Sequence, residues 1–232
     1  MYFHTFRHEL VKYQSAEANN PMSPKWEIPL MHSYVEGSED FNTDLRAYAE
    51  TIPHPDHFRK DSIDLELDGY TSEETNRIPE YNFLDTDNFA VQEFKNFIRL
   101  SHDNYIRGLK IEVPEHVKKS MKIQCWVNIL PPGEAIKPHN HYCGPNSWIS
   151  GNYCVNANKD TYTAYYSPSH EMRIANQPGM LTLFPSYLSH YTNKYMGNDK
   201  RITIAFDIFF DTLSQWSGEY EAIKESFFYA QT

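Results

Sequence analysis

The sequence predicts a mainly β fold, an antiparallel sandwich or barrel, with at least one helix in front of it. At least five short segments with alternating apolar residues fall within about ninety residues of the second half, and Pro and Gly separate them. No helical pattern lies between these segments, which argues against a parallel sheet with crossover helices. Near residue 112 the spacing of apolar side chains changes from a helical period to a period of two.

The composition is that of a globular protein. Of the 232 residues, 40% are apolar and 15% are aromatic, which excludes a disordered or collagen-like chain. The 21 Lys and Arg residues against 31 Asp and Glu residues give a formal charge of −10, and no segment concentrates basic residues. Binding to nucleic-acid phosphates requires a basic surface, so we expect no nucleic-acid partner. For the same reason we expect no binding to an anionic membrane surface.

Cysteine usage and hydropathy favour a cytoplasmic protein. Cys125, Cys143 and Cys154 are an odd number, and no Cys-x-x-Cys pair is present. The first residues lack the basic and apolar segments of a signal peptide, and no window reaches the ~18 apolar residues of a membrane-spanning helix. We therefore expect free thiols in a reducing compartment and no membrane partner.

The first half of the chain is expected to support the β region. Residues 1–80 are polar and rich in turns, so loops and short elements are expected there. From Asp87 onward apolar side chains recur at offsets near three and four, with Asp87 placed to cap the start and Gly108 near the end. This pattern predicts one amphipathic helix of about five or six turns, whose aromatic face covers the sheet.

The second half supplies the strands. The segment 200–210 is the clearest, because four apolar residues from Ile202 to Ile208 share one face. Residues 217–229 are suited to a short closing helix. Strands are predicted at 121–130, 148–155, 161–166, 180–184 and 200–210. The predicted division is a helical and irregular support region at 1–111, a β core at 112–212 and a C-terminal tail, helical in part, at 213–232.

Three histidines in the β region are candidate metal ligands. His139 and His141 are two residues apart, so in an extended chain both imidazoles project to the same face. A third ligand must come from elsewhere, and His190 is the best candidate because it closes a strand, turn and return strand at 179–190. Three facial ligands leave positions open for substrate and oxygen, as in non-haem iron oxygenases.

Arg201 opens the clearest strand and is a candidate carboxylate ligand. Arg201, Thr203 and Ala205 occupy the face opposite the apolar row, so the guanidinium points toward the histidines. A guanidinium fork is suited to bidentate binding of a carboxylate, and a buried arginine requires such a partner. A His-x-His pair alone is more often a surface or core pair, and an arginine at a strand start is usually exposed. The combination within one β region favours a site.

These residues lie in segments that resemble a family of 2-oxoglutarate- and Fe(II)-dependent oxygenases of phages and bacteria, related to prolyl and aspartyl hydroxylases. The resemblance covers about residues 121–210 and is most specific at 184–190 and at Arg201-Ile202-Thr203. The matching segments are Trp126-Val127-Asn128, Pro138-His139-Asn140-His141, Ser150-Gly151-Asn152-Tyr153, residues 178–190 and Arg201-Ile202-Thr203-Ile204-Ala205-Phe206.

The resemblance implies a double-stranded β-helix, or jelly roll, with iron at its mouth. His139 and His190 match the first and the distal metal ligands, Arg201 matches the residue that pairs with the 5-carboxylate of 2-oxoglutarate, and Thr203 adds a hydrogen bond. The implied activity uses Fe(II), 2-oxoglutarate as co-substrate and O2. It hydroxylates a C–H bond of a small-molecule or peptidyl substrate and releases succinate and CO2, in the host cytoplasm if a phage encodes the protein.

The sequence departs from this family at the second ligand. The wider superfamily usually has His-x-Asp or His-x-Glu, whereas His141 stands in that place here. Either the site has three histidines, or water fills the position; we take His141 as a ligand. Asn128 and Tyr153, on predicted strands, are candidate 2-oxoglutarate contacts.

Two other functions compete with this interpretation. One is a three-histidine cupin-type dioxygenase that does not use 2-oxoglutarate, and the other is a non-catalytic jelly roll with a structural or binding role. The sequence carries no signal for the oligomeric state or for one particular substrate.

Overall fold

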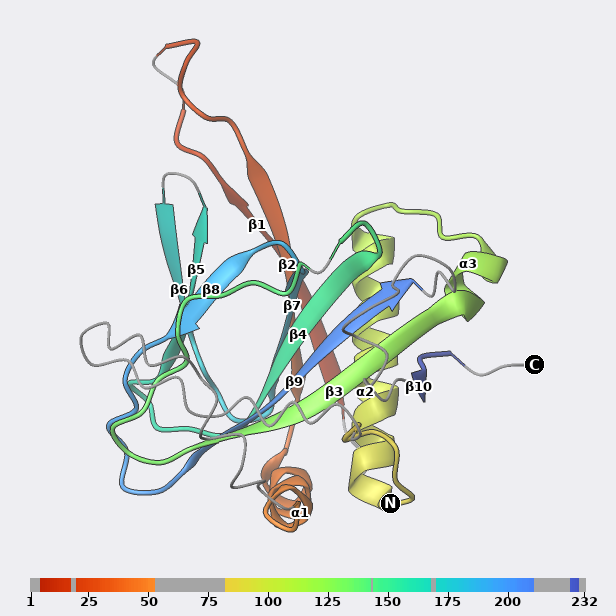
Figure 1. Ribbon diagram of the computed structural model, residues 1–232, viewed down its shortest axis with the longest axis vertical. Helices are drawn as coiled ribbons and strands as arrows, with labels where there is room; N and C mark the ends of the chain where they lie inside the picture. Colours follow the sequence, from red (N-terminus) through yellow and green to blue (C-terminus); the bar gives the residue numbers. More distant parts are fainter. Residues whose placement is uncertain are drawn as a thin grey trace.

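The computed structural model describes residues 5–17, 20–52, 82–142, 144–167, 170–210 and 226–229 (Figure 1). The strands are β1 (Phe6–Gln14), β2 (Glu27–Val35), β3 (Met121–Leu130), β4 (Ser147–Asn156), β5 (Tyr162–Ser167), β6 (His170–Ala175), β7 (Met180–Pro185), β8 (Ser189–Thr192), β9 (Arg201–Phe210) and β10 (Ser226–Phe227). The helices are α1 (Glu39–Ala49), α2 (Phe89–Gly108) and α3 (Glu115–Ser120).

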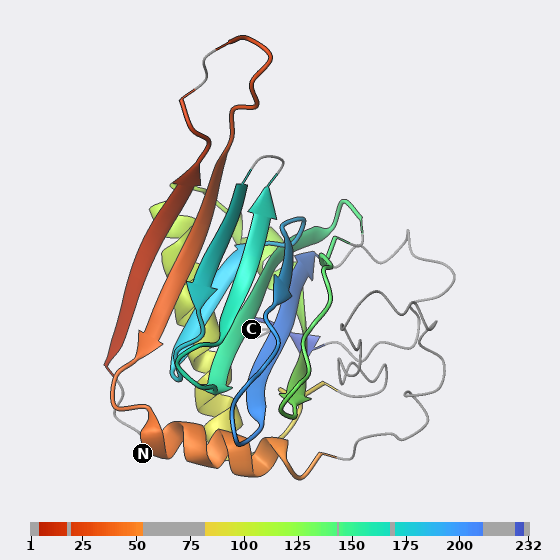
Figure 2. The same cartoon turned by 90° about the vertical axis from the view of Figure 1, so that its left-hand side faces the viewer.

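Two antiparallel sheets form the fold. The large sheet has the strand order β1-β2-β7-β4-β9-β3-β10 and the small sheet has the order β6-β5-β8. In Figure 2 the small sheet faces the viewer, the large sheet lies behind it, and α2 lies behind the large sheet. An apolar cluster joins the two sheets, because Leu30 of β2 and Phe184 of β7 pack with Tyr165 of β5 and Met172 of β6. The prediction of a mainly β, jelly-roll fold is confirmed.

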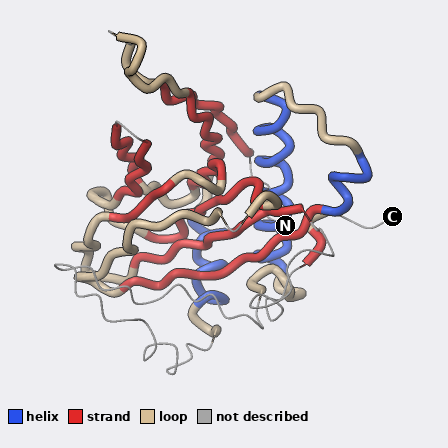
Figure 3. Tube along the Cα trace, turned by 45° about the horizontal axis from the view of Figure 1, so that its top comes forward, coloured by secondary structure: helices blue, strands red, loops and turns tan. Residues whose placement is uncertain are grey.

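The two faces of the large sheet differ: one packs against the helices through apolar side chains, and the other carries buried polar side chains beside an apolar cluster. Ile204 and Phe206 of β9 belong to the main core, together with Phe94 and Phe97 of α2, and Figure 3 shows the helices gathered on one side of the strands. Because successive side chains alternate across a strand, Arg201 and the other residues of its parity in β9 project from the opposite face. That face is directed toward the small sheet and forms the inside of the fold.

Helix α2 covers the outer face of the large sheet as predicted. Its start is one residue later than expected, because the side chain of Asn88, rather than that of Asp87, accepts a hydrogen bond of 3.2 Å from the Val91 amide. The helix ends at Gly108. The buried side chains lie on one stripe: Ala90, Val91, Phe94, Phe97, Ile98, Ser101, His102, Tyr105 and Ile106.

The N-terminal region contains more regular structure than predicted. Two strands of nine residues, β1 and β2, stand where loops and short elements were expected, and β2 pairs with β7 at the edge of the β core. The period of two is hidden in β2 because the polar residues His32 and Ser33 are buried and Pro29 interrupts the run. The expected loop interpretation of this part is therefore wrong.

The predicted strands agree with the observed ones to within one or two residues, and β6 was not predicted. The expected C-terminal helix is not found where the tail is described, since β10 pairs with β3 there. Most of the predicted tail helix, Cys143 and residues 53–81 lie outside the described residues. Cys125 and Cys154 are buried free thiols. No helix in the described parts of the chain is long and apolar enough to cross a membrane.

Candidate metal centre and carboxylate site

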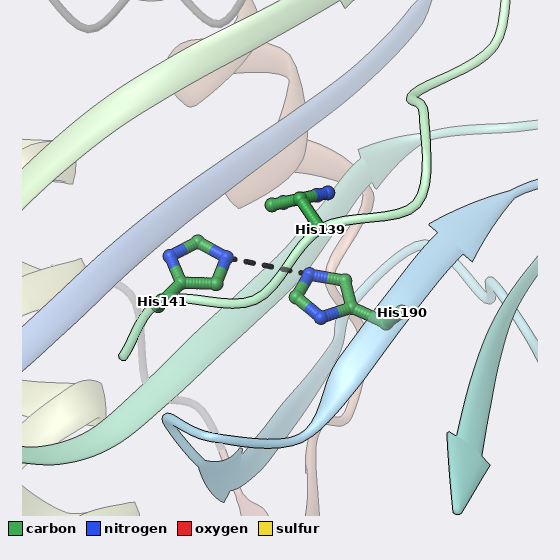
Figure 4. A group of neighbouring side chains, drawn as sticks. All are labelled: His139, His141 and His190. Atoms are coloured by element: carbon green, nitrogen blue, oxygen red, sulfur yellow. Dashed lines mark hydrogen bonds between the residues drawn. The ribbon is translucent and has the colours of Figure 1, made fainter. Parts of the chain in front are cut away.

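Backbone hydrogen bonds bring the three histidines together from distant parts of the chain. The amide of His139 donates to the carbonyl of His190 at 3.0 Å, and the amide of His190 donates back at 2.8 Å. The amide of His141 donates to the carbonyl of Ser186 at 2.9 Å, in the turn before β8. The ligand atoms of the three imidazoles all lie within 4.8 Å of one another (Figure 4). The predicted convergence is observed.

Each imidazole has its Nδ1 atom beside an oxygen acceptor. Nδ1 of His139 lies 2.7 Å from the carbonyl of Lys137, and Nδ1 of His190 lies 3.0 Å from the carbonyl of Leu188. Nδ1 of His141 lies 2.9 Å from Oδ1 of Asp207. An acceptor at Nδ1 favours the tautomer that keeps the proton there and leaves a lone pair on Nε2. The three Nε2 atoms are therefore available as ligands.

Burial favours the neutral, metal-binding form of His139 and His190. Burial lowers the pKa of His190 well below its ordinary value, and the neighbouring imidazoles lower it further. The pKa of His139 is also lowered, first by burial and then by His141. Neutral imidazoles are the form that coordinates a metal ion.

The spacing of the imidazoles fits a transition-metal ion. Nε2 of His141 and Nε2 of His190 are 3.3 Å apart (Figure 4). A metal–nitrogen bond of about 2.1 Å puts two adjacent nitrogen ligands about 3.0 to 3.4 Å apart. Three nitrogen donors on one side also leave coordination positions open.

Arg201 is the most unusual buried residue of the fold. Its exposed fraction is 0%, and none of the described residues makes a hydrogen bond to Nε, Nη1 or Nη2 of its guanidinium. Burial lowers the pKa of Arg201 to about 10, so it remains charged at neutral pH. A buried cation without a partner is strongly disfavoured. The donor set therefore fits a carboxylate that binds from solution.

The arginine and the histidines face the same interior. The ring centroids of Tyr165 and His190 are 5.6 Å apart. Burial raises the pKa of the Tyr165 phenol, and the charge of Arg201 opposes that rise. Thr203 is buried two residues beyond Arg201 on the same face, and it pairs in register with Asn128. The Oδ1 atom of Asn128 is buried and accepts no hydrogen bond from the described residues. Thr203 and Asn128 are thus placed beside Arg201.

Tyr153 lies on the opposite face, which corrects its predicted role. Its hydroxyl donates to Oδ1 of Asn42 in α1 at 2.6 Å, and its ring packs against Phe94 and Phe97 of α2. The inward side chains of β4 have the other parity, that of Ser150. Tyr153 is a core residue between sheet and helices, and this position does not allow contact with 2-oxoglutarate.

Asp207 was not singled out from the sequence. It is on β9, its side chain is largely buried, and its Oδ1 atom contacts both His141 and the hydroxyl of Ser150. A signal was present, because Asp207 has the same parity in the strand as Arg201 and Thr203 and so projects to the same face.

The fold and the site together define a class: an antiparallel double-sheet protein with a three-histidine cluster and a buried arginine that makes no hydrogen bond to the described residues. The model of the family described as Putative 2OG-Fe(II) oxygenase matches residues 155–207, which include His190 and Arg201. The resemblance predicted from the sequence is thereby confirmed. Fe(II), 2-oxoglutarate and O2, the predicted cofactors and co-substrates, are those of this family. The chain matches none of the curated proteins.

Several solved structures are similar to this chain at low identity. A Pseudomonas putida prolyl-4-hydroxylase has 12% identity and a TM-score of 0.45, covering 55% of this chain and 69% of its own. A Trichoplax adhaerens prolyl hydroxylase in complex with a hypoxia-inducible-factor peptide has 14% identity and a TM-score of 0.45, covering 74% and 79%. A non-haem α-ketoglutarate-dependent carbocyclase of nogalamycin biosynthesis has 8% identity and a TM-score of 0.49, covering 78% and 79%.

Proposed function

We propose that this protein is an Fe(II)- and 2-oxoglutarate-dependent dioxygenase that hydroxylates a C–H bond of a small-molecule or peptidyl substrate and releases succinate and CO2. The observation that carries this proposal is the fully buried guanidinium of Arg201, which makes no hydrogen bond to any of the described residues and lies on the same inner face as three converging imidazoles. The catalytic core is residues 112–212, on which the strands and helices of residues 1–111 pack. Its compartment is the reducing cytoplasm, where the buried thiols of Cys125 and Cys154 stay free.

The residues divide into metal ligands and co-substrate ligands. His139, His141 and His190 hold Fe(II) through their Nε2 atoms, because their Nδ1 atoms are engaged by oxygen acceptors. Arg201 binds the 5-carboxylate of 2-oxoglutarate, with Thr203 and Asn128 supplying polar contacts beside it. When bound, Fe(II) and 2-oxoglutarate supply the oxidising chemistry that activates O2.

Aromatic side chains pack against two of the three imidazoles, those of His141 and His190. The ring of Trp126 stacks on that of His141 with the centroids 5.6 Å apart, and the ring of Phe184 lies edge-on to that of His190 with the centroids 4.8 Å apart. Both aromatic side chains are buried. Such walls hold the ligand rings in place and keep bulk water from the reacting atoms.

Arg201 separates this function from its closest competitor. A three-histidine dioxygenase that does not use 2-oxoglutarate has no need for a buried carboxylate ligand at this place. A non-catalytic jelly roll needs neither the arginine nor a metal.

The test is succinate formation by the purified, untagged protein. We expect succinate and CO2 to form from 2-oxoglutarate only when Fe(II) and O2 are both present, and to be lost in the His190→Ala variant. O2 consumption without succinate would favour the competing dioxygenase. Absence of stoichiometric metal after reconstitution would favour the non-catalytic role.

A further inference from the structure

His141 differs from the other two histidines in what its Nδ1 atom contacts. In His139 and His190 this atom contacts the backbone carbonyl two residues earlier in the chain. In His141 it contacts a carboxylate, Oδ1 of Asp207, at 2.9 Å. His141 also stands where the resembling oxygenases carry a carboxylate ligand. In this chain the carboxylate of Asp207 therefore contacts the candidate ligand His141 and does not occupy the ligand position itself.

Asp207 is held in place by a closed ring of contacts. The hydroxyl of Ser150 donates to Oδ1 of Asp207 at 2.7 Å, and it is hydrogen-bonded to the hydroxyl of Ser186 at 2.9 Å. The carbonyl of Ser186 accepts the backbone amide of His141 at 2.9 Å. These contacts connect the backbone and the imidazole of His141 to β4, to β9 and to the turn before β8. Ser150, Ser186 and Asp207 are each at most 6% exposed.

The geometry places Asp207 outside the metal cluster. Among the described residues, the group whose ligand atoms lie within 4.8 Å of one another consists of the three histidines and does not include Asp207. Its carboxylate contacts the imidazole at Nδ1, the nitrogen away from the cluster. The contact between Asp207 and the cluster is therefore made through His141.

We propose that Asp207 is a positioning residue for the metal centre, and that Ser150 and Ser186 hold Asp207 in place. The carboxylate fixes the tautomer and the ring orientation of His141 and raises the basicity of its Nε2 atom, as such partners do for metal-binding histidines. This proposal rests on the proposed function, because it requires that the three histidines bind a metal ion.

The test measures metal affinity rather than turnover. Co(II) is titrated into the metal-free protein under argon, and its visible absorption reports both the dissociation constant and the ligand environment. Asp207→Asn keeps the shape of the side chain but removes its charge. We expect one Co(II) per chain, an unchanged band shape and a dissociation constant raised roughly 10- to 100-fold. Ser150→Ala removes the hydroxyl that contacts Asp207 and Ser186 but leaves the carboxylate in place, and it is expected to raise the dissociation constant by a smaller factor.

A double-mutant cycle shows whether Asp207 acts through His141. In a His141→Ala background the added Asp207→Asn change should leave the dissociation constant within about threefold, because the partner of the carboxylate is absent. Asp44→Asn removes one negative charge from an exposed position of α1 and is expected to bind Co(II) like the wild type. Circular dichroism and thermal unfolding of each metal-free variant establish that it is folded.

The outcomes separate this proposal from the proposed function. Wild-type affinity in Asp207→Asn overturns the positioning role, and so does an equal loss of affinity in both backgrounds. A changed band shape in Asp207→Asn also overturns it, because Asp207 would then be a ligand itself. Failure of the wild type to bind Co(II) at one per chain instead overturns the metal site and with it the proposed function.

Discussion

Replacing Arg201 by Met is expected to stabilise the ligand-free protein while abolishing tight binding of 2-oxoglutarate. The guanidinium is fully buried, and none of the described residues makes a hydrogen bond to it. Methionine is unbranched, of similar length and needs no polar partner. Arg201 would thus lower the stability of the ligand-free protein and supply binding energy in the complex with 2-oxoglutarate.

The magnitude of the stability change follows from the pKa of Arg201. Burial lowers it from 12.5 to about 10, which at ~1.4 kcal/mol per unit corresponds to about 3 kcal/mol. Because the folded state holds this proton less tightly than the unfolded chain, the charged group disfavours folding at every pH below about 10. Removing it should raise the free energy of unfolding by about 1 to 3 kcal/mol. For a chain of this size each kcal/mol shifts Tm by about 2 to 4 °C.

The loss of affinity follows from the contacts that a carboxylate makes with the guanidinium. A hydrogen bond to a charged group contributes ~1.5 to 3 kcal/mol, so a bidentate pair contributes about 3 to 6 kcal/mol. Since ~1.4 kcal/mol is a factor of ten, the dissociation constant of 2-oxoglutarate should rise about 10²- to 10⁴-fold. Binding of the metal ion should be unchanged.

The assay combines calorimetry of binding with thermal unfolding. The Mn(II)-loaded wild type and Arg201→Met are titrated with 2-oxoglutarate, and both are melted without ligand or metal. Arg173→Met serves as the control, because Arg173 is an exposed arginine on β6; its stability should change by at most ~0.5 kcal/mol. A variant that melts below the wild type without ligand, or that binds 2-oxoglutarate as tightly, refutes the reasoning.

Three further predictions concern the metal ligands, a buried histidine and a core glycine. His190→Ala should raise the dissociation constant for Co(II) at least ~100-fold, and wild-type metal content in that variant would contradict the three-ligand site. Burial lowers the pKa of His102 to about 4, and its Nε2 atom accepts a hydrogen bond from the indole of Trp148. The contribution of neutral His102 to stability is therefore complete above pH 6.5 and is lost as the pH falls toward 4. In urea unfolding, the free energy of unfolding of the wild type should fall by about 3 kcal/mol more over this range than that of His102→Gln. A Cβ at Gly151 would lie 2.2 Å from the Phe206 ring, so Gly151→Ala should lower the free energy of unfolding by about 1 to 3 kcal/mol, and Phe206→Leu should recover part of that loss.

The sequence predicts those elements whose local pattern matches their environment. β3 and β9 have apolar residues on alternate positions, so their bounds and their buried faces follow from the period of two. β2 escapes the same reasoning, because buried His32 and Ser33 look like surface residues until the strand beside them is known. β6 also escapes it, because most of its side chains are exposed.

The candidate site is predictable in its residues but not in all its contacts. The His-x-His spacing and the parity of Arg201 and Thr203 place these side chains on one face. The same parity count, applied to β4, assigns Tyr153 to the apolar face. The contact of Asp207 with His141 joins residues 66 positions apart (207 − 141), and no periodicity in either segment specifies it.

The central claim, that the histidine cluster and Arg201 form one Fe(II) and 2-oxoglutarate site, is tested most directly by anaerobic titration of the Fe(II)-loaded protein with 2-oxoglutarate. The measurement is the visible charge-transfer absorption that appears when the keto acid chelates the iron. One equivalent should saturate the wild type, and Arg201→Met should require at least ~100 times more ligand. Stoichiometric iron in the wild type with no absorbance change on adding 2-oxoglutarate would contradict the account.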